Sequence, residues 1–172
     1  MPLESPWLEQ ALSEQRFDIG LGETTDAPTG VELRALLTSN EVAVLPAGHR
    51  LCSRAVLQPQ DFANERFVSL AEGDPYRQAI DAMFLNAGVS RAMRLQTTSA
   101  VAVCAMVQQG LGVAIVNPLT AAAMAGTDMV VRPLAIAIPF SVGLLLPQVA
   151  TPHPLRDALV YAITHSAART II

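Results

Sequence analysis

Residues 95–118 read LQTTSAVAVCAMVQQGLGVAIVNP, and the order of residue types in this stretch decides the fold. Three hydroxyl residues, Thr97–Ser99, precede an apolar run, and Ser or Thr at such a place is typical of a helix N-cap. We predict a helix that begins at the first or second threonine and ends at Gln109. Gly110 suits the left-handed position after a helix end, and Val113–Val116 then has the composition of a buried strand.

The start of this helix has a second possible role. Backbone N–H groups, a partial positive charge and up to three hydroxyls together form an anion-binding helix end. The helix is apolar on nearly all sides, so we expect it to be buried. The simpler alternative is that one threonine caps the helix and the other hydroxyls do nothing.

A second strand-to-helix junction runs from Ser69 to Arg77, before a helix expected at 75–87. Ligands of open α/β sheets bind beyond the carboxyl ends of strands, so we expect Ser69, Arg77 and Thr97–Ser99 to converge on a carboxylate. Alternatively, Arg77 is a solvated helix residue paired with an aspartate, Asp74 or Asp81. A third junction, residues 22–25, offers Glu23 as a negative charge; its alternative role is plain loop polarity.

Along the whole chain, predicted strands alternate with predicted helices, which is typical of βαβ units, a largely parallel sheet and the α/β class. Helices are expected at 6–15, 75–87, 119–125 and 155–166. Strands are expected at 17–21, 33–37, 41–45, 67–70, 93–96, 113–116, 129–132 and 134–146. The strands at 33–37 and 41–45 are expected to be joined by a turn at Ser39-Asn40.

Composition narrows the function. The 172 residues are 51% hydrophobic and 15% charged, which favours a compact globule. The longest apolar runs are too short to cross a bilayer, and acidic Glu4 and Glu9 stand where a secretory signal would be basic. We therefore expect a cytoplasmic protein. The net charge is −4 and all 11 basic residues are scattered arginines, so the chain by itself should bind nucleic acid poorly.

The sequence lacks recognisable catalytic and nucleotide-binding motifs. The sequence contains no GxSxG, HExxH, P-loop or GxGxxG pattern. The cysteines, Cys52 and Cys104, form no CxxC pair, and the three histidines share no metal-ligand spacing with them. We expect no cofactor, no metal and no catalysis, so binding is the better interpretation.

The order of several segments resembles the effector-binding domain of LysR-type transcriptional regulators over nearly the whole chain. These segments are FDIGL (17–21), EVAVLPAGHRL (41–51), FVSL (67–70) and TSAVAVCAMVQQGLGVAIVNP (98–118). Within that family, other segments look most like the diaminopimelate-responsive activators of lysine biosynthesis. They are ESPWLEQALSEQRFDIGLGET (4–24), DPYRQAIDAMF (74–84), VNPLTA (116–121) and LAIAIPFSV (134–142).

The resemblance implies two Rossmann-like lobes joined by two crossover strands, a fold like that of type 2 periplasmic binding proteins. Lobe I would comprise 1–46 and 135–172, lobe II would comprise 47–134, and the effector would bind in the cleft between them. The first lobe would be truncated at its N-terminus, and the DNA-binding winged helix-turn-helix would be absent from this chain. Such a truncated lobe could bind effector weakly or pair abnormally. The partners implied are a small effector, a second copy in a dimer or tetramer, and DNA only through the missing domain, with no membrane.

The resemblance also implies effector-binding positions. They are Thr97, Thr98, Ser99, Ser69 with the loop after it, Asn117 and Glu23; the strand-to-helix junction adds Arg77 and Glu72 as candidates. Diaminopimelate carries two carboxylates and two ammonium groups; the hydroxyls and Arg77 suit the former, and Glu23, Glu72 or Asp74 the latter. Two other functions stay open on sequence alone: a periplasmic-type solute-binding protein, and an enzyme on the same bilobal fold.

Overall fold

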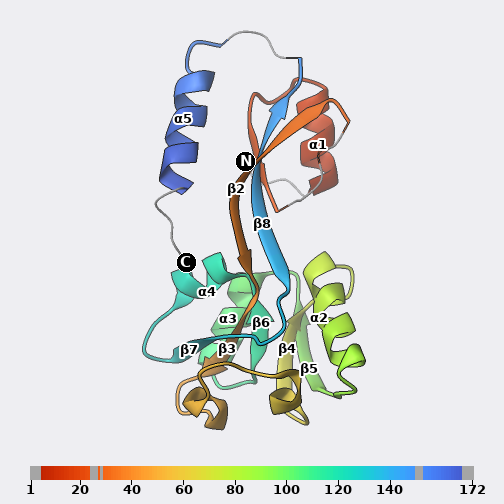
Figure 1. Ribbon diagram of the computed structural model, residues 1–172, viewed down its shortest axis with the longest axis vertical. Coiled ribbons are helices and arrows are strands. Elements are labelled where there is room, and N and C mark those ends of the chain that lie inside the picture. Colours follow the sequence, from red (N-terminus) through yellow and green to blue (C-terminus); the bar gives the residue numbers. More distant parts are fainter. Residues whose placement is uncertain (1–4, 24–26, 28, 150–152, 168–172) are drawn as a thin grey trace. The chain divides into compact units, whose positions relative to one another are not determined.

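The computed structural model describes residues 5–23, 27, 29–149 and 153–167 (Figure 1). The described residues form two compact units, one from Met1–Ser39 with Phe140–Ile171 and the other from Asn40–Pro139. The lobe boundaries expected from the sequence, at 46 and 135, stay a prediction; the two units divide between Ser39 and Asn40 and between Pro139 and Phe140.

The first unit has a three-stranded sheet with the strand order β1–β8–β2. Its strands are β1 (Gly20–Gly22), β2 (Val31–Asn40) and β8 (Pro139–Pro147), and β1 pairs antiparallel with β8. Two helices, α1 (Ser5–Ser13) and α5 (Arg156–Ala167), complete the unit. Its small buried core consists of Leu12, Val31 and Leu145.

The turn predicted at Ser39-Asn40 is wrong. Strand β2 continues to Asn40, and β3 (Val42–Pro46) begins after the single intervening residue Glu41. The backbone N–H of Glu41 donates to the carbonyl of Ile138 at 2.9 Å, so the chain stays extended where the polar residues suggested a turn.

The second unit has a mixed sheet. Strands β4 (Arg66–Leu70) and β5 (Ala92–Thr97) pair in parallel, and β6 (Ala114–Val116) joins β4 through a parallel bridge between Phe67 and Val113. On the other side of β6, β3 pairs antiparallel with both β6 and β7 (Met129–Pro133). The prediction of a largely parallel sheet holds only for β4, β5 and β6, because β3 runs antiparallel to both β6 and β7.

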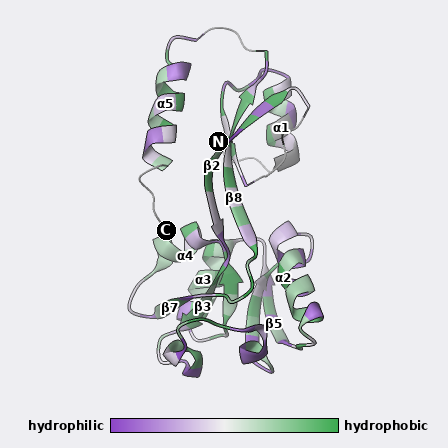
Figure 2. Cartoon of the chain, in the orientation of Figure 1, coloured by the Kyte–Doolittle hydropathy of each residue, from purple (hydrophilic) through white to green (hydrophobic). Residues whose placement is uncertain are grey.

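Helices cover both faces of this sheet, since alternate strand residues point to opposite sides. Helix α2 (Pro75–Asn86) and the short 3₁₀ turn η2 (Pro59–Phe62) pack on one face; α3 (Ala100–Gln108) and α4 (Pro118–Met124) pack on the other. Figure 2 shows strand β6 as strongly hydrophobic, and all of its residues are buried. The first core includes Phe62, Phe67, Ile80, Phe84 and Ile115; the second includes Val44, Val68, Val103, Val107 and Val116.

Helix α3 differs from its prediction at both its start and its surface. Its N-cap is Ser99, because Thr97 is still the last residue of β5. The expected burial on nearly all sides is also wrong, since Val101 is 53% exposed. The predicted end is confirmed: Gly110 has φ +72°, and the N–H of Leu111 reaches back to the carbonyl of Met106 at 3.1 Å.

Gly112 lies where the chain leaves α3 and meets the sheet. A Cβ at this position would stand 2.5 Å from the backbone oxygen of Arg66, so only glycine lets the strands approach this closely. The two glycines therefore have different functions: Gly110 supplies a left-handed turn, and Gly112 permits close packing of the strand that follows α3.

Candidate functional site

The carboxyl ends of β4, β5 and β6 lie at one edge of the second unit's sheet. Ser69 pairs in register with Gln96 and Leu70 with Thr97, and the bridge between Phe67 and Val113 makes β6 parallel to β4. Residues that follow these three strands therefore meet at the same edge. We call this edge, with Ser69, Thr97–Ser99 and Asn117, the carboxyl edge.

The three hydroxyls at the start of α3 have different surroundings. The Ser99 Oγ accepts the N–H of Ala102 at 3.3 Å, and the Thr97 Oγ1 accepts the N–H of Ser99 at 3.4 Å. Thr98 is exposed, and its hydroxyl has no hydrogen bond within the described part of the chain. A hydroxyl that accepts a backbone N–H still has its own proton to donate. Capping and anion binding are thus compatible at this helix end.

Ser69 is buried next to the end of β4. The residue is 1% exposed, and its Oγ has no hydrogen-bond partner among the described residues. A buried hydroxyl without a partner costs about 1–3 kcal/mol, and such groups are rare in native proteins. This hydroxyl lies at the carboxyl edge, at the end of β4, among the residues expected to form the site.

Asn117 follows β6 and caps α4. Its Oδ1 accepts the N–H of Thr120 at 2.7 Å, and the side chain is half-buried. The oxygen is therefore committed to the helix, while the amide group keeps its two N–H donors.

The Arg77 side chain is buried and bonded to groups within the protein. The residue is 5% exposed, its Nε donates to both carboxylate oxygens of Asp81 at 2.8 Å, and its Nη1 donates to the Leu70 carbonyl at 2.9 Å. The alternative pairing with Asp81 is therefore what the structure shows, although the side chain is buried and not solvated. Arg77 holds the end of β4 in place.

A second arginine, Arg91, donates a hydrogen bond to the Asp81 carboxylate. Its guanidinium lies 4.1 Å from the centre of the Phe84 ring. Burial raises the pKa of the Asp81 carboxyl, but hydrogen bonds from Arg77 and Arg91 outweigh it and hold that pKa below its ordinary value. No local motif marks Arg91 in the sequence, because its contacts depend on tertiary packing.

The acidic candidates lie in different places. Glu72 is exposed in the turn after β4, and Asp74 is the N-cap of α2, where its Oδ1 accepts the N–H groups of Tyr76 and Arg77. Glu23 is exposed in a bend after β1, in the first unit. The two residues that follow it, Thr24 and Thr25, lie outside the described residues.

The described residues form no metal-binding cluster, and the buried cysteine, Cys104, is unreactive. The described residues contain no cluster of three His, Cys, Asp or Glu side chains placed to hold a metal ion. Burial raises the pKa of the Cys104 thiol to about 11, so it stays protonated at neutral pH. Within the described part, no helix has the length and apolar character needed to cross a membrane.

Comparison with known proteins defines the family. Residues 2–168 match the family model of the LysR substrate binding domain. The chain is 47% identical over 164 residues to the transcriptional activator protein LysR of Escherichia coli (strain K12), which covers 95% of this chain and 51% of that protein. The chain belongs to the LysR substrate binding domain family, and it spans about half the length of this relative. The relative is named as a transcriptional activator, which agrees with the expectation of binding and not catalysis.

Solved structures confirm the expected fold class. A putative LysR family transcriptional regulator from Pseudomonas aeruginosa superposes with a TM-score of 0.79 at 22% identity, covering 96% of this chain and 58% of that one. The effector-binding domain of QuiR, solved in complex with shikimate, gives a TM-score of 0.75 at 15% identity, covering 98% and 80%. At these identities the likeness shows the fold alone: an α/β fold of the type 2 periplasmic-binding-protein kind.

Proposed function

We propose that this chain is the ligand-sensing part of a LysR-type transcriptional regulator and that its effector is a small amino acid, diaminopimelate. The two compact units would be the two lobes. The observation that carries the proposal is the carboxyl edge, where the buried, unpartnered hydroxyl of Ser69 lies beside the hydroxyl-rich start of α3. The 47% identity to an activator named LysR supports a role in controlling lysine biosynthesis.

The carboxyl edge has the donors that a carboxylate needs. The first N–H groups of α3 lack partners within the helix, and the positive end of the helix dipole favours an anion there. The protons of Ser69, Thr98 and Ser99 add hydroxyl donors. Hydrogen bonds to a charged group contribute about 1.5–3 kcal/mol each, more than bonds between neutral groups.

The ammonium groups of diaminopimelate need acceptors. Glu72 is exposed in the turn that follows β4, next to the carboxyl edge, and it is our candidate in the second unit. Glu23 in the first unit stays a prediction from the family resemblance. The contacts of Arg77 with Asp81 and Leu70 support a positioning role for this arginine, in place of direct carboxylate binding.

The sensor would work by differential binding. An effector that binds one arrangement of the regulator better than another shifts a pre-existing equilibrium by the ratio of its two affinities. The intact regulator would be a cytoplasmic dimer or tetramer whose DNA is bound by a different domain. The shift would change the orientation of that domain.

The test is isothermal titration of the full-length protein with meso-diaminopimelate, L-lysine and pimelate. Lysine lacks one carboxylate and pimelate lacks both ammonium groups, so we expect both to bind at least about tenfold more weakly than meso-diaminopimelate. Thr98→Val should weaken diaminopimelate binding, while Thr127→Val, at an exposed position between α4 and β7, should not. Absence of heat with folded protein, or equal affinity for all three ligands, would rule out the proposed effector.

A further inference from the structure

The second unit contains a cavity far from the carboxyl edge. Its volume is about 290 Å³, and it is lined by residues of η2, of the C-terminal end of α2 and of the segment between β7 and β8. The carboxyl edge lies at the other end of α2, near Pro75. Because α2 has 12 residues, the two ends are roughly 18 Å apart, so the cavity is a separate feature.

Two walls of the cavity are held together by aromatic packing. Phe62 ends η2, and Phe84 follows Met83 in α2; their rings meet edge to face with centroids 5.5 Å apart. The third wall, which carries Ile136, is tied to the same region, since the N–H of Ala135 donates to the carbonyl of Leu57 at 2.9 Å. These contacts fix the walls against one another before any ligand arrives.

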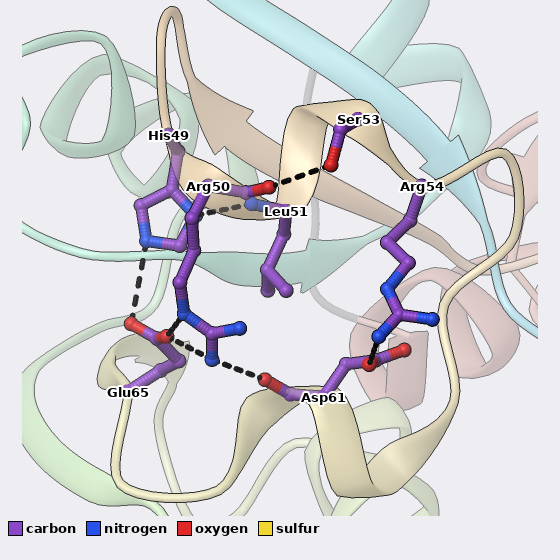
Figure 3. Close-up of polar contacts among 7 residues, drawn as sticks. All are labelled: His49, Arg50, Leu51, Ser53, Arg54, Asp61 and Glu65. Atoms are coloured by element: carbon purple, nitrogen blue, oxygen red, sulfur yellow. Dashed lines mark hydrogen bonds and ion pairs between the residues drawn. The ribbon is translucent and has the colours of Figure 1, made fainter.

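A polar network holds the end of η2 (Figure 3). The Nη2 of Arg50 donates to the backbone carbonyl of Asp61 at 3.0 Å, and its Nε donates to Glu65 at 2.7 Å. Arg54 pairs with the Asp61 carboxylate at 3.6 Å, and His49 contacts Glu65 at 3.3 Å. The Asp61 carboxylate also accepts the N–H of Gln58 at 2.8 Å, so the network reaches the residue at the cavity's rim.

The lining of the cavity has a distinct chemistry. Met83 and Pro59 are buried and give an apolar floor, and Ile136 is 43% exposed beside it. The polar residues that line the cavity are Gln58, Gln60 and Asn86, all of which carry carboxamide side chains. None of the described residues that line the cavity has an ionisable side chain. The site therefore offers apolar contact and neutral hydrogen bonds, and it has no partner for a charge.

We propose that this cavity is a binding site for a small, uncharged molecule with a compact apolar body and an amide or hydroxyl group. Ligand sites are typically concave and mostly apolar, with a few polar groups, and this half-open cavity combines a mostly apolar lining with three carboxamide residues. Its volume equals the liquid volume of roughly ten water molecules, which suits a ligand of about ten non-hydrogen atoms. The site is independent of the function proposed for the carboxyl edge.

The test compares benzamide with benzoate on the full chain. The two probes have nearly the same shape, but only benzoate is charged. The chain has six methionines, so ¹³C-methyl labelling reports on Met83 against the others. We expect a saturable shift of the Met83 methyl with benzamide, with a Kd on the order of 1 mM, and at least a tenfold weaker response to benzoate. An unmoved Met83 methyl at about ten times that concentration, or equal responses to the two probes, would overturn the proposal.

Variants locate the site. Gln60→Ala removes one rim carboxamide without disturbing the floor and should weaken benzamide binding severalfold. Gln78→Ala, an exposed carboxamide on α2 outside the cavity, is the matched control and should leave the binding unchanged. Ala87→Phe should fill the cavity and abolish the Met83 response. Because the bulky variant can fail to fold, the Gln60→Ala result decides: equal affinity in Gln60→Ala and Gln78→Ala would contradict the assignment.

Discussion

Replacing Ser69 by alanine should separate stability from binding. The Ser69 Oγ is buried and has no hydrogen-bond partner among the described residues, so the folded state loses the hydration of this hydroxyl without compensation. That loss is about 1–3 kcal/mol. Ser69→Ala removes one oxygen and leaves the strand in place, so the free energy of unfolding should rise by about 1 kcal/mol or more. Effector affinity should fall in the same variant, because a hydrogen bond to a carboxylate contributes about 1.5–3 kcal/mol, roughly 10- to 150-fold.

The assay is urea denaturation of the variant and the parent, followed by titration with meso-diaminopimelate. Ser99→Ala is the informative comparison, since the Ser99 Oγ accepts the N–H of Ala102 and caps α3. Loss of a cap costs about 0.5–2 kcal/mol, so Ser99→Ala should destabilise the protein where Ser69→Ala stabilises it. The reasoning is refuted if Ser69→Ala destabilises by more than about 1 kcal/mol, which would show that the hydroxyl is satisfied in the folded protein.

Three further predictions follow from other residues. Gly112→Ala should destabilise by about 1–3 kcal/mol through its contact with a β4 carbonyl, whereas Gly126→Ala, which meets open space, should change the urea midpoint little. Iodoacetamide labelling of the folded protein at pH 8 should modify the partly exposed Cys52 and spare Cys104. The pKa of Cys104, about 11, leaves only about 0.1% of this thiol as thiolate at that pH. Mass spectrometry measures the labelling of each cysteine, and equal labelling of the two would contradict this prediction. The pKa of Asp81 is lowered in the folded state, so the ion pairs of Asp81 stabilise the protein fully above its unfolded pKa near 3.9. This stabilisation is lost as the pH falls through the lower folded pKa. Asp81→Asn should therefore make the free energy of unfolding depend less on pH below about pH 4, and an unchanged dependence would argue against the ion pairs.

Local signals predicted several elements closely. The sequence predicts a helix over 75–87, and α2 runs from Pro75 to Asn86, with Gly88 at φ +66° after it. Gly110 was expected to end the next helix, and it does, because a left-handed residue at this place has few alternatives to glycine. The turn expected at Ser39-Asn40 failed because polar residues favour turns only when the backbone has no better partner, and here a distant carbonyl supplies one.

The candidate site was predictable as a location and not in its atomic detail. The strand-to-helix junctions indicated that Ser69 and the Thr97–Ser99 segment belong at one edge, and the parallel register of β4 and β5 places them there. Which hydroxyl caps α3 depends on where β5 ends, and that is decided by pairing with β4. Whether Arg77 reaches a ligand or an internal partner depends on Asp81 and the Leu70 carbonyl. The cavity lined by Gln60 and its neighbours combines three distant segments, so no local pattern indicates it.

The most direct measurement is an amide ¹⁵N titration of the protein with meso-diaminopimelate, observing the first turn of α3. If the carboxyl edge grips the effector's carboxylate, the N–H groups of residues 100–102 and the amide of Thr98 will shift saturably, with one Kd shared by all of them. The same titration on Ser69→Ala should give the same shifted residues with a larger Kd. Saturable shifts elsewhere in the protein, with the first turn of α3 unmoved, would contradict the account.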